Sequence, residues 1–181
     1  MEKEALKRIF EFLEEKENKL HIKKGTLMWK LSFNEPLTEK DLNVKSHLVF
    51  SNKGIETLPE GLKVGGSLIL HKTNIKSLPE GLEVGGWLDV SNTKITSLPE
   101  GLKVGGFLSL YSSHITSLPE GLEVGGELNL YSTYITSLPE GLKVGGDLHI
   151  FGTPLKKYTN KELREMIKPG FIKGKIYRRY L

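Results

Sequence analysis

The chain has 181 residues, which is enough for one domain, with a formal net charge of +4 and no cysteine. Without cysteine, a disulfide scaffold, a thiolate metal site and a cysteine nucleophile are all excluded. No apolar run approaches the roughly 20 residues that span a bilayer, and the densely charged N-terminus lacks the apolar core of a signal peptide. We therefore expect a soluble, cytoplasmic protein without a membrane segment.

The charge is distributed unevenly along the chain. Residues 25–155 carry 10 Lys and Arg against 14 Asp and Glu, a balance of −4, whereas residues 156–181 carry 9 basic against 2 acidic residues, a balance of +7. Such asymmetry can mark binding of nucleic acid or of an acidic partner. It is equally compatible with a solvated end that keeps the chain soluble.

Residues 1–41 are predicted to form an N-terminal helix and a capping strand. Residues 3–20 place apolar side chains at i, i+3, i+4 and i+7, the spacing of an amphipathic helix. These side chains are Leu6, Ile9, Phe10 and Leu13. The segment from Leu27 to Phe33 alternates apolar with other residues, which predicts a first, half-buried strand.

A strict repeat occupies residues 42–155. The string Leu-Pro-Glu-Gly-Leu occurs five times at a spacing of 20 residues, starting at Leu58, Leu78, Leu98, Leu118 and Leu138. A fixed period of this length predicts a solenoid, in which each coil buries its apolar face only by stacking on the next coil. A degenerate first coil precedes the regular ones, with Leu42, Val44, Leu48 and Phe50 at equivalent positions.

Each repeat position has a predicted role. Leu58-Pro59-Glu60-Gly61 fits a type I turn, and Gly65-Gly66 offers φ freedom and close approach of neighbouring backbones. In the strand that follows, Leu68 and Leu70 point inward while positions 67, 69 and 71 point outward. The predicted interior is completed by Leu62, Val64, Ile75 and Leu78.

Residues 156–181 are predicted to form a C-terminal cap with a basic tail. Thr159 and Glu162 have capping-box spacing, and Leu163, Met166 and Ile167 give a short apolar helical face that Pro169-Gly170 ends. Residues 171–177 are then predicted to form a last short strand or a hairpin.

The coil Gly65-x-x-Leu68-x-Leu70-x-x-Thr73-x-Ile75 resembles the leucine-rich repeat, and Leu-Pro-x-x-Leu resembles its short bacterial form. Two departures are that Gly replaces the family's first Leu and that Thr or Ser replaces the usual Asn, where the hydroxyl is expected to bond to a neighbouring turn. The resemblance implies a solenoid with a parallel sheet face and protein binding on that face. Some bacterial members carry a ubiquitin-ligase domain with a catalytic Cys, which this chain lacks.

Equivalent positions of stacked strands form columns about 4.8 Å apart. We define three on the predicted outer face: the first column (Ser67, Trp87, Phe107, Glu127, Asp147), the middle column (Ile69, Asp89, Ser109, Asn129, His149) and the last column (His71, Ser91, Tyr111, Tyr131, Phe151). The aromatic side chains of these columns are predicted to form an outward cluster flanked by carboxylates. The candidate partner-binding residues are Trp87, Phe107, Tyr111, Tyr131, Asp89 and Phe151.

Exposed aromatic side chains are the usual anchors of interfaces. The alternative is that β-propensity and cross-strand stacking place aromatic residues at exposed strand positions. On balance the pattern favours a non-enzymatic protein-binding module with no cofactor.

The basic tail supports two further hypotheses. The tail mixes basic with aromatic residues, which is a weak signal for nucleic-acid or acidic-surface binding, and a solvated terminus explains the mixture as well. The basic residues are Lys173, Lys175, Arg178 and Arg179. The tail could also dock on the mildly acidic solenoid of another copy, giving a homo-oligomer.

Other charged positions favour structural roles. Lys63, Glu83, Lys103, Glu123 and Lys143 alternate in sign, which predicts a ladder of ion pairs worth under about 1 kcal/mol each. Glutamates at positions 60, 80, 100, 120 and 140 form a like-charge, solvated edge. The histidines share no column, so no metal site is expected.

Overall fold

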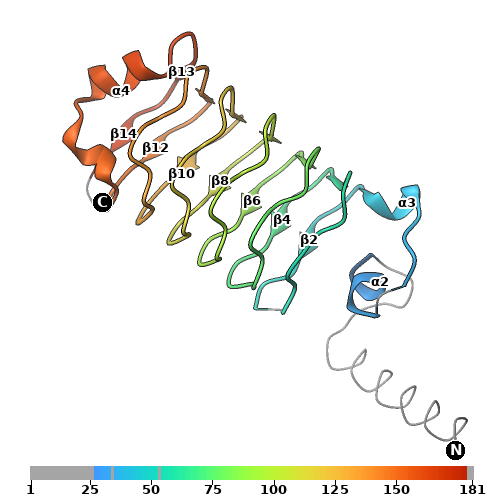
Figure 1. The fold of residues 1–181 in the computed structure, drawn as a ribbon. Helices are drawn as coiled ribbons and strands as arrows, with labels where there is room; N and C mark the ends of the chain where they lie inside the picture. Colours follow the sequence, from blue (N-terminus) through green and yellow to red (C-terminus); the bar gives the residue numbers. More distant parts are fainter. Residues whose placement is uncertain (1–26, 34, 53, 179–181) are drawn as a thin grey trace, which may run out of the picture. The chain divides into compact units, whose positions relative to one another are not determined.

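The computed structural model describes residues 27–33, 35–52 and 54–178 (Figure 1). The chain divides after Leu42 into two compact units, and each is considered by itself. The amphipathic helix predicted for residues 3–20 and the tail residue Arg179 lie outside the described residues.

The first unit contains helix α2 (Leu27–Phe33) and helix α3 (Glu39–Leu42). The prediction of a strand from Leu27 to Phe33 is therefore wrong. A short apolar run does not distinguish strand from helix by periodicity alone, and this one contains no β-branched residue but several good helix formers. Lys30 pairs with Asp41 at 2.7 Å, and this contact, with hydrogen bonds from Thr38, lowers the pKa of Asp41 to about 2.

The second unit is a parallel β-solenoid with two sheets, which confirms the predicted repeat architecture (Figure 1). Sheet A pairs β1 (Asn43–Val44), β3 (Lys63–Val64), β5 (Glu83–Val84), β7 (Lys103–Val104), β9 (Glu123–Val124), β11 (Lys143–Val144) and β13 (Phe171–Ile172). Sheet B pairs β2 (Leu48–Val49), β4 (Leu68–Ile69), β6 (Leu88–Asp89), β8 (Leu108–Ser109), β10 (Leu128–Asn129), β12 (Leu148–His149) and β14 (Ile176–Tyr177). Sequence reasoning anticipated only sheet B, because a two-residue strand before Gly-Gly leaves no alternation to detect.

The interior follows the repeat. Leu62, Val64, Leu68, Leu70 and Ile75 have at most 2% of their surface exposed, and their equivalents in the later coils are buried in the same way. Truncating one such side chain to Ala removes its transfer free energy and leaves a cavity, at a cost of roughly 2 to 5 kcal/mol. The first coil joins this core through Leu48 and Phe50.

The glycine pair of each coil serves close stacking. A Cβ on Gly125 would lie 2.1 Å from the carbonyl oxygen of Gly105, a distance that only backbone displacement could relieve. Neither position of the pair has a left-handed φ, so the predicted φ freedom is not used there. The left-handed glycines are instead those of the turn, beginning with Gly61 at φ 71°.

The hydroxyl groups that replace the family's Asn are buried and hydrogen-bonded. Thr73 donates to the carbonyl oxygen of Leu70 at 2.7 Å, and the Thr or Ser of the next four coils does the same. Each bond closes a turn within its own coil, so the prediction that the hydroxyls bond to neighbouring turns is wrong.

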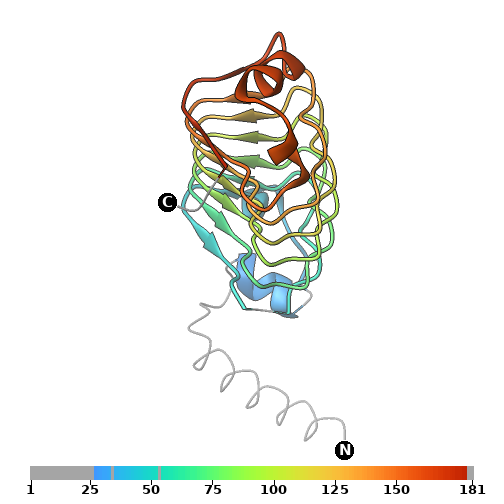
Figure 2. The same cartoon turned by 90° about the vertical axis from the view of Figure 1, so that its left-hand side faces the viewer.

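The residues after the repeats add one longer coil. A 3₁₀ helix, η1 (Pro154–Lys157), is followed by helix α4 (Asn160–Met166), whose capping box between Thr159 and Glu162 confirms the prediction. β13 and β14 then join different sheets, so the hairpin alternative is wrong. Figure 2 shows the coils one behind another, with the C-terminal residues, in red, across the end of the stack.

Candidate binding face on the outside of sheet B

The three outer columns lie on the outside of sheet B because their neighbours at positions 68 and 70 point into the core. The first and last columns are four positions apart along the strand, or about 13 Å at 3.3 Å per residue. The predicted aromatic cluster is therefore divided between two columns, with the middle column between them.

In the first column, Trp87 has 60% of its surface exposed and Phe107 is half-buried. Their rings meet edge to face with centroids 6.4 Å apart. Toward the N-terminal end, polar residues occupy the same positions and accept a backbone hydrogen bond from the next coil. His47 Nδ1 accepts from the N–H of Ser67 at 2.9 Å, and Ser67 Oγ accepts from the N–H of Trp87 at 3.1 Å.

The same bond returns at the other end of the first column, where Asp147 Oδ1 accepts from the N–H of Lys175 at 2.7 Å. Trp87 and Phe107 carry no side-chain oxygen, so neither can accept from the N–H of the residue that follows it in the column. The two aromatic residues thus replace a contact that stabilises other coils.

The last column is arranged differently. The rings of Tyr111 and Tyr131 stack at 4.9 Å, and those of Tyr131 and Phe151 stack at 5.0 Å. These distances match the spacing of stacked strands, so the rings continue the coil repeat on the outside of the sheet. Tyr131 and Phe151 are half-buried, and Tyr111 at one end of the stack is 38% exposed.

The middle column supports the backbone. Asp89 Oδ1 accepts from the N–H and the hydroxyl of Ser91, and Asn129 Oδ1 accepts from the N–H of Tyr131. His149 lies 3.4 Å from a Glu127 oxygen and stacks on Tyr177 with centroids 4.9 Å apart. Asp89, a predicted binding residue, therefore has a structural contact as well as a half-buried position.

The outer face of the five regular coils is acidic. Its three columns carry Asp89, Glu127 and Asp147 but no Lys or Arg. A surface of this kind attracts cationic groups over a distance of about one Debye length, 8 Å at physiological ionic strength.

The basic tail is built into the solenoid up to residue 178. Lys173 and Lys175 use their backbone N–H groups to bond Val144 and Asp147 of the preceding coil. Arg178 donates from Nε to Asn160 Oδ1 at 2.8 Å, and its two terminal nitrogens donate to the carbonyl oxygens of Tyr158 and Lys156. The guanidinium of Arg178 therefore holds the C-terminal loop.

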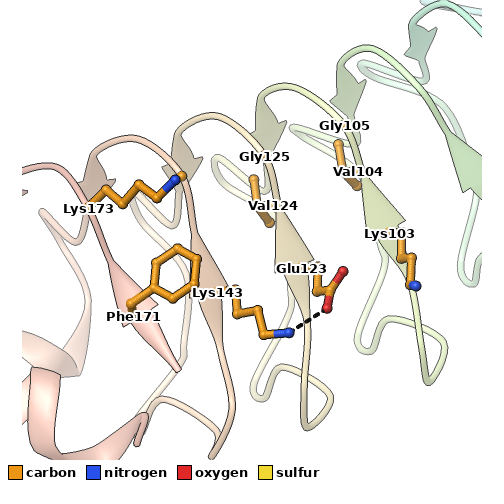
Figure 3. Close-up of a pocket in the computed structure, with 10 residues that line it drawn as sticks. Lys103, Val104, Gly105, Glu123, Val124, Gly125, Lys143, Phe171 and Lys173 are labelled. Carbon is orange, nitrogen blue, oxygen red and sulfur yellow. Dashed lines mark hydrogen bonds and ion pairs between the residues drawn. The ribbon is translucent and has the colours of Figure 1, made fainter. Parts of the chain in front are cut away.

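Sheet A carries a shallow hollow of about 390 Å³ on its outside (Figure 3). Lys103, Lys143 and Lys173 lie around it together with Phe171, which is 42% exposed. Lys143 pairs with Glu123 at 2.8 Å, and this hydrogen bond, with the charges of Lys143 and Lys103, lowers the pKa of Glu123.

The predicted ladder of alternating charges forms in part. Ion pairs join Lys143 to Glu123 and, at the other end of the column, Lys63 to Glu83 at 2.6 Å. Sequence reasoning also missed one prominent surface residue. Tyr134 is 61% exposed and lies 6.3 Å from the His114 ring, in a column at positions 74 to 154 whose residue types vary as much as those of the outer face.

The described residues contain no group of three or more His, Cys, Asp or Glu placed to hold a metal ion. In the same part of the chain, no helix has the length and apolar character needed to cross a membrane. No family model, curated protein or solved structure matches this chain.

Proposed function

We propose that the chain is a non-enzymatic binding module that engages a protein partner with the outer face of sheet B. Trp87 and Phe107 are the main anchors, with Tyr111 and Tyr131 beside them. The resemblance of the coils to the leucine-rich repeat supports this role, since that family commonly binds proteins on its strand face.

The observation that carries the proposal is the substitution within the first column. At equivalent positions His47, Ser67 and Asp147 accept a backbone hydrogen bond, Glu127 contacts His149 at 3.4 Å, and Trp87 and Phe107 do neither. An intramolecular hydrogen bond contributes about 1 kcal/mol to stability, so folding alone favours a polar residue here. Tryptophan is also one of the residue types that are enriched among interface anchors.

The charge of the face restricts the partner. Three carboxylates share the outer columns with the aromatic residues, and complementary charge mainly increases the association rate and selects among partners. We therefore expect a partner with a basic contact surface, in which Arg or Lys side chains can also lie over the indole of Trp87.

The experiment compares capture of partners from the native host by the wild-type chain and two double variants. Trp87→Ser/Phe107→Ser removes the proposed anchors, and serine is the residue that the fold itself uses at position 67. Tyr134→Ser/Phe171→Ser removes two aromatic side chains that are exposed outside this face.

The expected result is that a protein retained by the wild type and by the second variant is lost with the first. Circular dichroism should give the same spectrum for all three chains. Equal retention by both variants, or loss with the second variant alone, would contradict the proposal.

A second candidate function is the binding of an anionic ligand at the hollow of sheet A. The three lysines around the hollow and the exposed Phe171 ring combine basic and aromatic groups, as single-stranded nucleic-acid sites do. Lys173→Glu with Lys103→Glu should then abolish a binding signal for single-stranded oligonucleotides that falls steeply with salt. Deleting residues 171–181 is not a suitable test, because it removes β13 and β14.

A further inference from the structure

Sheet A follows one hydrogen-bonding rule from coil to coil. The N–H groups of the glycine pair donate backward, as Gly145 does to Val124 at 2.8 Å and Gly146 does to Gly126 at 2.8 Å. In the last coil the same two bonds run from Lys173 to Val144 and from Gly174 to Gly146, both at 2.9 Å. A further coil would thus place its donors on the carbonyl oxygens of Ile172 and Gly174, the equivalents of Val144 and Gly146.

The side chain of Arg164 occupies these two acceptors. Its Nη1 donates to the carbonyl oxygen of Ile172, and its Nη2 donates to that of Gly174 at 2.8 Å. The planar guanidinium offers two parallel N–H donors in a fixed fork. Arg164 therefore takes the place of the two backbone N–H groups that a next coil would supply.

Helix α4 fixes the position of this guanidinium. Leu163 and Ile167 on either side of Arg164 are fully buried, so the turn of the helix that carries the arginine is anchored to the core. The capping box of Thr159 and Glu162 closes the first turn, with bonds of 2.6 and 3.2 Å. Hydrogen bonding by Thr159 also lowers the pKa of Glu162.

The first coil carries the complementary groups. Lys45 and Ser46 stand where later coils have the glycine pair, so their N–H groups hold the donor positions of sheet A. In sheet B the polarity is reversed, because Leu48 donates forward to Ser67 and Leu148 donates forward to Lys175. The hydrogen-bond polarity of the C-terminal edge of one copy therefore matches that of the first coil of a second copy in both sheets.

We propose that the C-terminal edge of sheet A is a docking site for the first coil of a second copy of this chain, and that Arg164 keeps it closed. A contact of this kind joins two different surfaces, and because coils stack in one direction it leaves a free edge at each end and adds copies into a filament. Unprotected sheet edges are the usual route to such association, and native proteins block them. On the sheet A edge the two acceptors are blocked by the side chain of Arg164, which satisfies both.

The test measures the mass of the full chain by sedimentation velocity over a hundredfold range of concentration. Arg164→Ala should raise the mass with concentration, and electron microscopy should show filaments, while the wild type stays at lower mass. Lys168→Ala is the matched control, because Lys168 follows the same helix, pairs with Glu165 at 2.7 Å and is exposed. It should keep the wild-type mass.

A second substitution tests the register of the contact. Lys45→Pro removes one of the two donors of the first coil, so Arg164→Ala/Lys45→Pro should return to the wild-type mass. Arg164→Lys keeps the positive charge without the planar fork and should assemble to a lesser extent than Arg164→Ala. If Arg164→Ala does not fold, the mass of Arg164→Lys tests the proposal in its place.

A folded Arg164→Ala or Arg164→Lys chain with the wild-type mass at every concentration would overturn the proposal. So would assembly that persists after Lys45→Pro. Because these measurements involve no partner protein, their outcome is independent of the role proposed for Trp87 and Phe107.

Discussion

The first and last columns of sheet B both carry aromatic side chains, but these side chains contact their surroundings differently. Tyr111, Tyr131 and Phe151 stack at the spacing of the coils, so each ring covers the next. Trp87 and Phe107 meet edge to face, and the indole remains 60% exposed.

The two columns differ in whether an aromatic residue stabilises the folded chain. In the last column an aromatic ring improves packing against the ring of the next coil, which explains its presence without a partner. In the first column an aromatic ring removes a hydrogen bond that a serine or aspartate makes. The exposed fraction of a side chain does not distinguish a structural aromatic residue from one that is available to a partner. The contact that the residue gains or loses within the chain does distinguish them.

The largest expected effect comes from changing the spacing that the last column depends on. Gly125→Ala would place a Cβ 2.1 Å from the Gly105 carbonyl oxygen and force apart the coils of Tyr111 and Tyr131. We expect the free energy of unfolding to fall by about 3 kcal/mol, the upper range for overpacking. Urea denaturation measures this free energy, and near-ultraviolet circular dichroism should show a reduced tyrosine signal.

Gly121→Ala is the matched control for this change. A Cβ at Gly121 meets open space, and only the backbone angle φ of 65° opposes it, which costs about 1 kcal/mol. A Gly121→Ala chain that is less stable than Gly125→Ala would show that coil spacing does not limit the stack.

The next effect tests whether the last column is structural. Tyr131→Ser removes two stacked contacts, each worth about 0.5 to 1.5 kcal/mol. We expect the free energy of unfolding to fall by about 2 kcal/mol, measured by urea denaturation. A decrease below about 0.5 kcal/mol would place Tyr131 with the proposed anchors instead.

A smaller effect is expected in the first column. Trp87→Ser loses the edge contact with Phe107 but offers an oxygen to the N–H of Phe107, as Ser67 does to that of Trp87. Since both terms are about 1 kcal/mol, the free energy of unfolding should change by less than that. If Trp87→Ser instead destabilises the chain as much as Tyr131→Ser does, the two columns have the same structural role.

The smallest effect on stability is expected from a substitution on sheet A, which carries neither of the two columns that are compared. Lys143→Gln removes the hydrogen bond and the charge that lower the pKa of Glu123, so this pKa should rise toward 4.5 in an NMR titration. A carboxyl whose pKa is lowered by folding stabilises the folded state at pH values above its ordinary pKa, and this contribution is lost as the pH falls through the lowered pKa. The free energy of unfolding of the variant, which lacks this contribution, should therefore decrease less on acidification than that of the wild type. Capture of the partner should not change.

Several features of the fold were predictable from the chain. The 20-residue period placed Leu62, Leu68, Leu70 and Ile75 in the core because their spacing is repeated without a slip. Thr159 and Glu162 predicted the start of helix α4 because a capping box needs only local contacts. The strand predicted for Leu27 to Phe33 failed because a run of seven residues fits both periods.

The candidate site was predictable only in its composition. Listing equivalent positions identified the aromatic residues of the outer face, but it did not separate Trp87 and Phe107 from the stacked rings. Tyr134 was missed because its column was not compared, although its residue types vary in the same way.

The sequence by itself determined the coil length, the inward positions and the surfaces that vary, since these depend on periodicity and on the burial of apolar side chains. The tertiary structure alone revealed the second sheet, the stack of the last column and the closure of the sheet A edge by Arg164. Each of these depends on residues 8 to 28 positions apart coming within contact distance. Such distances are set by how coils stack, and local sequence does not encode them.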